Sequence, residues 1–255
     1  ACLIDSPEGV DEHSTLAAKE GRLLDVYLDL NVGMNRTGVR IRDSVGLAGL
    51  IRKKRNLDLI GLHAYDGHLL GKSFQEREVA CDAIMRQVFD LKATLEKDGY
   101  QELTRVMGGS CSFPFYAIDS RIQCSPGTFV YWDRGYGVNL PEQDFSPAAV
   151  LLSRVVSKPT NTTICVDLGY KAIASENPLD KRFYFIGDEN LKPLSHSEEH
   201  LVVDIKNSER PWRVGDELYV LPYHICPTVA MYDEVKVIAD QRHTEDWLIE
   251  ARSRY

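Results

Sequence analysis

Short apolar runs alternate with amphipathic stretches through the first 132 residues of the chain. The apolar runs, which predict strands, are residues 2–4, 26–30, 57–65, 104–107 and 122–132. Stretches with the period of a helix are residues 11–20, 43–55 and 113–118, together with a longer one that begins near Ser73. Strands that alternate with helices of this length predict a parallel sheet, either doubly wound or closed into a barrel.

The longest predicted helix carries its own start and stop signals. Ser73 and Glu76 have the spacing of a capping box, in which each side chain accepts a hydrogen bond from the other residue's backbone. Gly99 is expected to end the helix. The residues predicted to face the core are Ile84, Val88, Leu91 and Leu95.

The pattern changes after about residue 145. Residues 149–157, 162–166, 200–205 and 217–221 predict strands, with turns between them and little helical periodicity. We therefore expect an α/β domain over residues 1–145 and a mostly β domain over residues 146–255.

Composition argues against several classes of partner. The chain has 255 residues and a formal charge of −8, which argues against binding to a nucleic acid or an anionic membrane. No apolar stretch approaches the roughly 18 residues of a membrane span, and we expect a cytoplasmic protein. The six cysteines are scattered without paired spacing, so a disulfide framework is not expected.

Glycine and hydroxyl residues gather where the predicted strands end, which is the end that carries the active site of a parallel barrel. Such turns present backbone N–H groups to an anion, above all to a phosphate. Gly108, Gly109 and Ser110, before a predicted helix, are the best candidate for this cradle. Taken singly, each loop is better explained as ordinary turn chemistry. The group of loops predicts a site for a phosphorylated small molecule.

His224 and Cys226 form the most informative pair in the chain. In an extended strand, residues two positions apart project from the same face, so an imidazole nitrogen and a thiolate sulfur can reach one metal ion. This donor set suits zinc and other borderline-soft divalent ions. The alternative is an ordinary strand that carries a half-buried histidine and a small apolar cysteine.

Several ordered blocks resemble the fold-type III pyridoxal-phosphate enzymes, of which alanine racemase is the best-known member. The run 28–39, LDLNVGMNRTGV, is similar to that family's Asp-x-Gly-Met-x-Arg-x-Gly segment. Blocks that resemble one branch, the D-threonine aldolases and metal-dependent D-serine dehydratases, are residues 61–68, 108–110, 125–130, 167–172 and 197–200. The resemblance covers the chain nearly end to end. It implies a (β/α)8 TIM-type barrel followed by a mostly β domain, and a homodimer.

The resemblance assigns roles to the residues that match the family's motifs. Arg36 matches the arginine that approaches the phenolic oxygen of pyridoxal phosphate, and Tyr65 stands where the family places a catalytic residue close to the coenzyme. His224 and Cys226 match the ligands of a divalent metal (zinc, manganese or magnesium), so His224 is also expected to be catalytic. The residues that match the phosphate-holding loops are Gly108, Gly109, Ser110, Gly127 and Thr128.

Two departures from the family pattern change what is expected. The alanine racemases carry an arginine against the pyridine nitrogen where this chain has Ser125, which makes racemisation the less expected reaction. The family's Schiff-base lysine lies at the end of the first barrel strand, but only five of a barrel's eight strands are predicted here. We therefore expect the chain to be the C-terminal part of a longer polypeptide, with that lysine outside it. Lys171 is the obvious substitute, but it lies in the predicted β domain, where a solvated surface lysine is expected.

The favoured function is aldol cleavage of a D-β-hydroxy amino acid to glycine and an aldehyde, dependent on pyridoxal phosphate and a divalent metal, as in a D-threonine aldolase. D-serine dehydratase-like elimination to a keto acid and ammonia, and racemisation of an amino acid, are alternatives. Two other classes stay open. A coenzyme-binding protein would not need His224 and Cys226, whereas a metal hydrolase would recruit further ligands such as His68 and His200.

Overall fold

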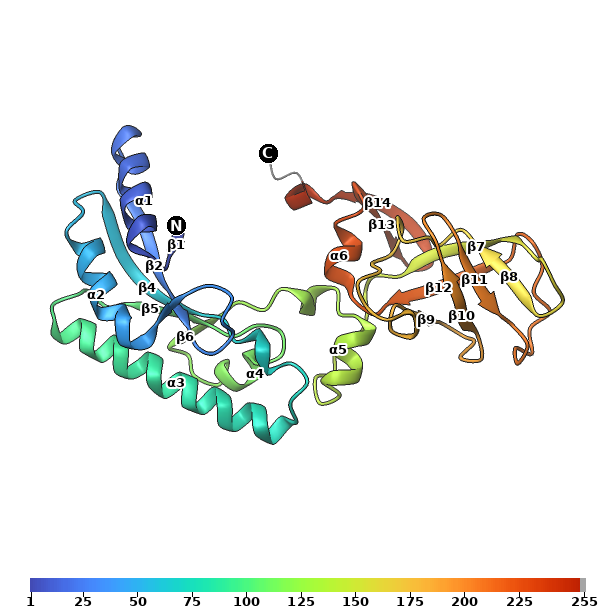
Figure 1. The fold of residues 1–255 in the computed structure, drawn as a ribbon, viewed down its shortest axis with the longest axis horizontal. Coiled ribbons are helices and arrows are strands. Elements are labelled where there is room, and N and C mark those ends of the chain that lie inside the picture. Colours follow the sequence, from blue (N-terminus) through green and yellow to red (C-terminus); the bar gives the residue numbers. More distant parts are fainter. Residues whose placement is uncertain (253–255) are drawn as a thin grey trace. The chain divides into compact units, whose positions relative to one another are not determined.

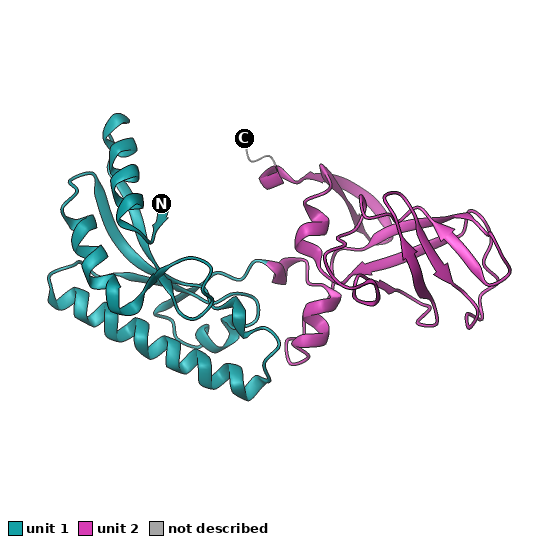
Figure 2. Ribbon diagram, viewed as in Figure 1, with its two compact units in different colours: residues 1–127 teal, residues 128–255 magenta. Residues whose placement is uncertain are grey.

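The computed structural model describes residues 1–252, which divide into two compact units (Figure 2). Unit 1 is Ala1–Gly127, and unit 2 begins at Thr128. The sequence pattern places the domain boundary further along the chain, after residue 145. Each unit has its own sheet, parallel in unit 1 and antiparallel in unit 2.

The sheet of unit 1 is built from parallel strands (Figure 1). Its strands are β1 (Cys2–Ile4), β2 (Leu24–Asn31), β3 (Val39–Arg40), β4 (Leu57–Ala64), β5 (Thr104–Met107) and β6 (Ile122–Cys124). They form a row in the order β1-β2-β4-β5-β6, with the short β3 beside β2, and every pairing is parallel. The predicted parallel sheet is therefore confirmed.

The three longer helices pack against this sheet through β2 and β4, and the short one packs against β6. The helices of unit 1 are α1 (Pro7–Lys19), α2 (Ile41–Arg52), α3 (Phe74–Lys97) and α4 (Phe113–Tyr116), with one 3-10 turn, η1 (Gly67–Leu69). The predicted capping box of α3 is present between Ser73 and Glu76. The four residues predicted for the core face of α3 are buried, and Gly99 follows the helix with a φ of +88°. Both helix signals are therefore confirmed.

The two faces of β2 differ in chemistry. Val26, Leu28 and Leu30 alternate along one face, and all three are buried. Asp29 lies on the other face, directly opposite His63 of β4 in the strand register. The second face therefore brings polar side chains of neighbouring strands together.

The last predicted strand of unit 1 is wrong in its length. The pattern predicts a strand over residues 122–132, but β6 ends at Cys124. Pro126 has no N–H group to donate to a ladder, so the strand cannot continue in the sheet. Beyond it, η2 (Thr128–Val130) is a single 3-10 turn, and Trp132 has a φ of +52°. The chain leaves the sheet in the loop that the sequence assigns to the phosphate.

Unit 2 is mostly antiparallel sheet, as the pattern predicts. Its main sheet has the order β10-β11-β8-β7-β12-β9, and β13 and β14 form a separate hairpin. The strands are β7 (Leu151–Ser157), β8 (Thr163–Val166), β9 (Phe183–Phe185), β10 (Lys192–His196), β11 (Leu201–Asp204), β12 (Glu217–Pro222), β13 (Glu234–Ala239) and β14 (Arg242–Leu248). The four predicted strands correspond to β7, β8, β11 and β12, whereas the other four have no counterpart in the prediction.

Apolar side chains form the core of unit 2, and its helices are short. The core includes Val155, Ile164, Val166, Leu201, Val203, Trp212 and Val220, all buried. The helical segments besides η2 are α5 (Arg134–Asn139), α6 (Ile225–Val229), η3 (Leu179–Lys181) and η4 (Glu250–Arg252). Across residues 1–252, no helix has both the length and the apolar character needed to cross a membrane.

Candidate functional site

Arg36 and Tyr65 are brought together in unit 1. Arg36 lies in the loop after β2, where Asn31 Oδ1 accepts hydrogen bonds from the backbone N–H groups of Gly33 (3.0 Å) and Asn35 (3.1 Å). The guanidinium carbon of Arg36 lies 4.7 Å from the centroid of the Tyr65 ring, within the range of a cation–π contact. Within residues 1–252, no carboxylate forms an ion pair with Arg36. Its charge is therefore available to an anionic ligand.

Hydrogen bonds to other protein groups hold the predicted phosphate loop, Gly108 to Ser110, in place. Gly108 donates its N–H to the Ala64 carbonyl at 3.2 Å, and Gly109 donates its N–H to Ser112 Oγ at 3.1 Å. These two glycines therefore shape the loop, and their N–H groups are used within the protein. A Cβ atom on Gly109 would lie 2.7 Å from Tyr65 Cε2, and Gly108 has a φ of +80°. The helix that follows, α4, is a single turn, so it adds little of the field that a long helix supplies.

A buried carboxylate fixes this loop from behind. Ser112 donates its hydroxyl to Asp66 Oδ1 at 2.5 Å, and Tyr116 donates its hydroxyl to Asp66 Oδ2 at 2.7 Å. All three side chains are buried. Burial, together with the nearby Asp66 carboxylate, raises the pKa of Tyr116, so its hydroxyl remains a donor. Asp66 thus orients the Ser112 hydroxyl that receives the N–H of Gly109.

A carboxylate–imidazole pair on the sheet is a candidate site that the sequence analysis misses. His63 Nδ1 lies 2.6 Å from Asp29 Oδ1, and the two residues are register partners on β4 and β2. Asp29 is buried and His63 is partly buried. The carboxylate favours the tautomer with the proton on Nδ1, which leaves Nε2 as an acceptor. Strand alternation was the available signal, because Asp29 and His63 each lie in a predicted strand, next to apolar residues that face the other side.

The His224–Cys226 pair lies at the start of a helix in unit 2, so the extended backbone on which the sequence analysis paired the two residues is wrong for Cys226. His224 immediately precedes α6 and has an extended backbone (φ −132°, ψ 106°), whereas Cys226 lies in the first turn of that helix. Pro227 is tolerated there, because the first turn of a helix does not need its N–H. Asp133 Oδ2 accepts the N–H of Ile225, between the two predicted ligands, at 2.9 Å. Proline and this carboxylate thus favour a helical turn in place of the extended strand assumed for the pair.

His224 and Cys226 nevertheless interact directly. A hydrogen bond with Cys226 raises the pKa of His224 to about 9 despite partial burial, and Glu176 acts in the same direction. The same hydrogen bond lowers the pKa of the Cys226 thiol, helped by the Thr128 hydroxyl 3.2 Å from the sulfur. The pair therefore favours a thiolate, the form in which cysteine binds a metal ion.

Glu176 contacts the other side of the His224 ring. His224 Nδ1 lies 2.6 Å from Glu176 Oε1, which leaves Nε2 as the nitrogen available to a metal. The described part of the chain contains no group of three or more His, Cys, Asp or Glu side chains placed to hold a metal ion. Within unit 2, His200, one of the further ligands of the hydrolase hypothesis, therefore does not join His224 and Cys226. Two protein donors are suited to an ion whose other positions are filled by water or substrate.

The remaining predicted residues have varied surroundings. Ser110 is buried, and a Cβ atom on Gly127 would meet no described atom within 4 Å. Lys171 forms ion pairs with Glu198 (2.9 Å) and Glu199 (2.8 Å) and is exposed. Its hydrogen bonds with Glu199 and Glu198 raise the pKa of its ammonium group. The prediction of a solvated surface lysine is confirmed.

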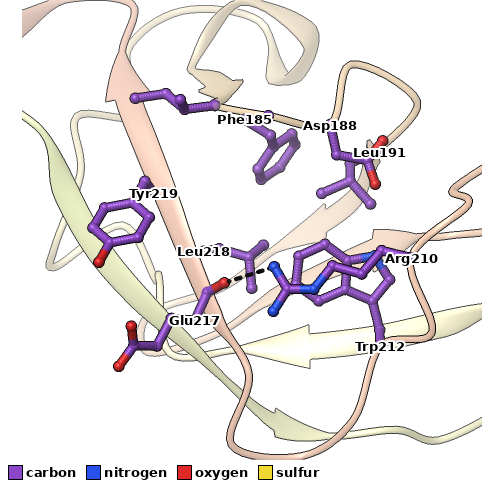
Figure 3. Close-up of a pocket in the computed structure, with 10 residues that line it drawn as sticks. Phe185, Asp188, Leu191, Arg210, Trp212, Glu217, Leu218 and Tyr219 are labelled. Atoms are coloured by element: carbon purple, nitrogen blue, oxygen red, sulfur yellow. Dashed lines mark hydrogen bonds between the residues drawn. The ribbon is translucent and has the colours of Figure 1, made fainter.

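A cavity of about 270 Å³ in unit 2 contains none of the predicted site residues (Figure 3). Its apolar lining includes Phe185, Leu191, Leu218 and Tyr219. The Arg210 guanidinium carbon lies 4.0 Å from the centroid of the Trp212 ring, and Arg210 donates a hydrogen bond to the Glu217 carbonyl at 3.3 Å. This cation is therefore engaged within the protein, and the cavity is not our candidate site.

Comparisons with known proteins give a family match for most of each unit. Residues 1–135 match the family model described as the alanine racemase N-terminal domain. Residues 148–238 match the model described as a putative serine dehydratase domain.

Two curated proteins are similar to the chain along nearly all of its length. The 3-hydroxy-D-aspartate aldolase of Paracoccus denitrificans (strain Pd 1222) and the D-threonine aldolase of an Arthrobacter species are each 26% identical to it over 98% of the chain. The chain spans 66% of the length of each relative. The crystal structure of D-threonine aldolase from Filomicrobium marinum has a TM-score of 0.88 at 23% identity, covering 98% of this chain and 68% of that one. This last similarity shows a shared fold.

Proposed function

Because the chain belongs to the family of the alanine racemase N-terminal domain, we propose that it binds pyridoxal phosphate and cleaves D-β-hydroxy amino acids to glycine and an aldehyde. The names of the two curated relatives support this reaction and suggest D-threonine and 3-hydroxy-D-aspartate as substrates. The single observation that carries the proposal is the placement of His224 and Cys226 together at the start of α6, with the Thr128 hydroxyl 3.2 Å from the Cys226 sulfur. The parallel sheet of unit 1 would then form part of a (β/α)8 barrel.

Residues of unit 1 fit an anionic coenzyme. Arg36 has no ion-pair partner within residues 1–252, and Gly108 and Gly109 keep side chains out of the predicted phosphate loop. When bound, pyridoxal phosphate supplies an electron sink for negative charge that develops at the substrate Cα. Arg36 would donate charge-assisted hydrogen bonds to its phenolic oxygen. Asp29 would hold the His63 ring through Nδ1 and leave Nε2 as a hydrogen-bond acceptor.

Residues of unit 2 fit a divalent metal ion. His224 offers Nε2, and Cys226 offers a sulfur whose pKa is lowered toward the thiolate form. An ion held there supplies a Lewis acid that lowers the pKa of the substrate's β-hydroxyl. Asp133 would keep the two ligands in place through its hydrogen bond from the Ile225 amide. Thr128, matched to the phosphate loops, would also hold the Cys226 sulfur.

The position of proton loss decides between two reactions. Loss of the β-hydroxyl proton lets the Cα–Cβ bond break to release an aldehyde, and a proton returned to Cα then gives glycine. Loss of the α-proton with departure of hydroxide gives an unsaturated amino acid, which tautomerises to an imine that water hydrolyses to a keto acid and ammonia. The match of residues 148–238 to a putative serine dehydratase domain favours this second reaction as the alternative. Racemisation has less support, because Ser125 donates its hydroxyl to the Gly108 carbonyl at 3.1 Å and offers no cation to a pyridine nitrogen.

The test is to incubate the purified protein, pyridoxal phosphate and Mn²⁺ or Zn²⁺ with D-threonine, 3-hydroxy-D-aspartate or D-serine. Glycine with an aldehyde supports aldol cleavage, and ammonia with a keto acid supports the dehydratase alternative. If protein with bound coenzyme forms neither pair of products, both reactions are contradicted. His224→Ala should abolish turnover and retain coenzyme absorbance, and a chelator should have the same effect. Unchanged turnover in that variant would exclude the metal assignment.

A further inference from the structure

We propose that Glu176 is a positioning residue that orients His224 toward the metal ion. The inference rests on the proposed function, because it takes His224 and Cys226 as the metal site. The carboxylate of Glu176 would accept the Nδ1–H of His224 and present Nε2 to the ion. In such a carboxylate–histidine–metal arrangement, the outer carboxylate fixes the ring and raises the basicity of the ligand nitrogen.

The contact between the two side chains is short but exposed. Nδ1 and Oε1 are 2.6 Å apart, the distance of a charge-assisted hydrogen bond. The His224 and Glu176 side chains are 42% and 46% exposed. Exposed ion pairs contribute little by themselves. A positioning role therefore requires that other contacts hold the two backbones in place.

One buried hydroxyl ties the Glu176 segment to His224. Thr228 is 2% exposed. Its Oγ1 accepts the backbone N–H of Ala174 at 3.2 Å and donates to the His224 carbonyl at 2.8 Å. Ala174 lies two residues before Glu176. A single oxygen atom therefore joins the segment that carries the carboxylate to the residue that carries the imidazole.

A second contact holds the other side of Glu176. Arg182 donates its Nε–H to the carbonyl of Asn177, the next residue, at 2.6 Å. The side chain of Asn177 also donates to Glu176 Oε1, at 3.4 Å. Anchored on both sides, the carboxylate stays beside His224 even though water reaches it.

The geometry places the Glu176 carboxylate against the His224 ring, where it supports a ligand and does not itself bind the ion. Its hydrogen bond is to Nδ1 of His224, which leaves Nε2 of that ring for the ion. Within residues 1–252, Glu176 does not join His224 and Cys226 in a group that could hold a metal. Removing the carboxylate should therefore weaken metal binding without removing a bond to the ion.

Metal affinity tests the proposal, measured with Zn²⁺ in competition with a chromophoric chelator and repeated with Co²⁺, whose absorption reports a thiolate ligand. Glu176→Ala should weaken Zn²⁺ binding about 10- to 100-fold and retain the cobalt–thiolate band. Glu176→Gln keeps an acceptor oxygen without the charge, so its affinity should lie between those of the wild type and Glu176→Ala. Glu217→Gln is the matched control, since Glu217 is an exposed carboxylate paired with Arg154, and it should not change the affinity.

The possible failures can be told apart. If the wild type does not bind Zn²⁺, or if His224→Ala binds it equally well, the metal site of the proposed function is wrong. If His224→Ala abolishes binding but Glu176→Ala binds as the wild type does, only the role of Glu176 is overturned. Should Glu176→Ala lose its circular dichroism signal, the isosteric Glu176→Gln carries the test, and wild-type affinity in that variant would overturn the proposal.

Discussion

The candidate site residues of the two units differ in their exposure to solvent. In unit 1, the loop matched to the phosphate is backed by Asp66, whose buried carboxylate accepts two hydroxyl hydrogen bonds. In unit 2, the core of the sheet is apolar, and His224 and Cys226 stand at the start of a short helix, where Cys226 is exposed. A buried carboxylate is tolerated only when hydrogen bonds satisfy it. An exposed pair depends instead on the few bonds that hold its backbone.

This difference matches what each site is proposed to bind. A loop that holds a coenzyme needs a constant shape, and the Gly108 and Gly109 amides are accordingly bonded within the protein. A metal site with two protein donors must admit water and substrate, so it has to stay open to solvent. Unit 1 should therefore respond to changes in packing, and unit 2 to changes in individual hydrogen bonds.

Removal of the buried carboxylate in unit 1 should have the largest effect. Asp66→Ala leaves the hydroxyls of Ser112 and Tyr116 without their acceptor, and we expect a loss of about 3 kcal/mol in the free energy of unfolding. Far-UV circular dichroism during denaturation follows the long helices of unit 1. Tryptophan fluorescence follows unit 2, which contains all three tryptophans. An unchanged dichroism midpoint would show that the network does not stabilise unit 1.

A methyl group in the phosphate loop should have the next largest effect. Gly109→Ala places a Cβ atom 2.7 Å from Tyr65 Cε2, so we expect a loss of about 2 kcal/mol in stability and weaker binding of pyridoxal phosphate in a spectroscopic titration. Gly127→Ala is the control for stability, because its Cβ atom meets no described atom within 4 Å. Equal stability of the two variants would mean that the loop adapts.

Loss of the buried hydroxyl in unit 2 should have a smaller effect on stability. Thr228→Val is nearly isosteric but leaves the Ala174 amide unpaired, so we expect a loss of about 1–2 kcal/mol, measured by tryptophan fluorescence during denaturation. Zn²⁺ affinity should fall as well, because the Glu176 segment is released from His224. Thr162→Val, at an exposed position, is the control. Wild-type Zn²⁺ affinity in Thr228→Val would show that the hydroxyl does not align the two segments.

The smallest expected effect is the pH response of His196 in unit 2. Burial lowers the pKa of His196, whose Nδ1 lies 3.1 Å from the Arg182 guanidinium and whose Nε2 lies 3.0 Å from the Leu168 carbonyl. The folded state thus binds a proton less readily than the unfolded state, whose histidine pKa is about 6.5. The stabilisation is complete above that pH and is lost as the pH falls below it.

His196→Gln should flatten the dependence of stability on pH between about pH 7 and 5, followed by tryptophan fluorescence. Identical slopes in wild type and variant would contradict the assignment.

The features that the sequence predicts correctly are those decided by neighbours along the chain. Ser73 and Glu76 form their capping box within one turn, and the alternation of apolar runs with helices fixes a parallel sheet in unit 1. The overlong strand at 122–132 arose because an apolar run continues past Pro126, although proline cannot take part in the ladder.

The features that the sequence does not predict depend on distant partners. His224 and Cys226 are identified as a pair, but their helical turn is supported by Asp133, 92 residues before the amide that it binds. Glu176 lies 48 residues from His224, and Asp29 lies 34 residues from His63. Hydrophobic periodicity does not show which distant residues meet in the fold, so only the structure reveals these contacts.

Asp133 links two structures that the chain keeps apart. Its Oδ1 accepts the Tyr136 amide at the start of α5, and its Oδ2 accepts the Ile225 amide between the two proposed ligands. If the first turn of α5 unwinds, or if the turn that carries His224 and Cys226 opens, a hydrogen bond to the Asp133 side chain breaks in either case. The bound ion could then leave only through the same opening that lets the Tyr136 and Ile225 amide hydrogens exchange with solvent. The rate of metal release and the rate of this hydrogen exchange would be limited by one kinetic barrier.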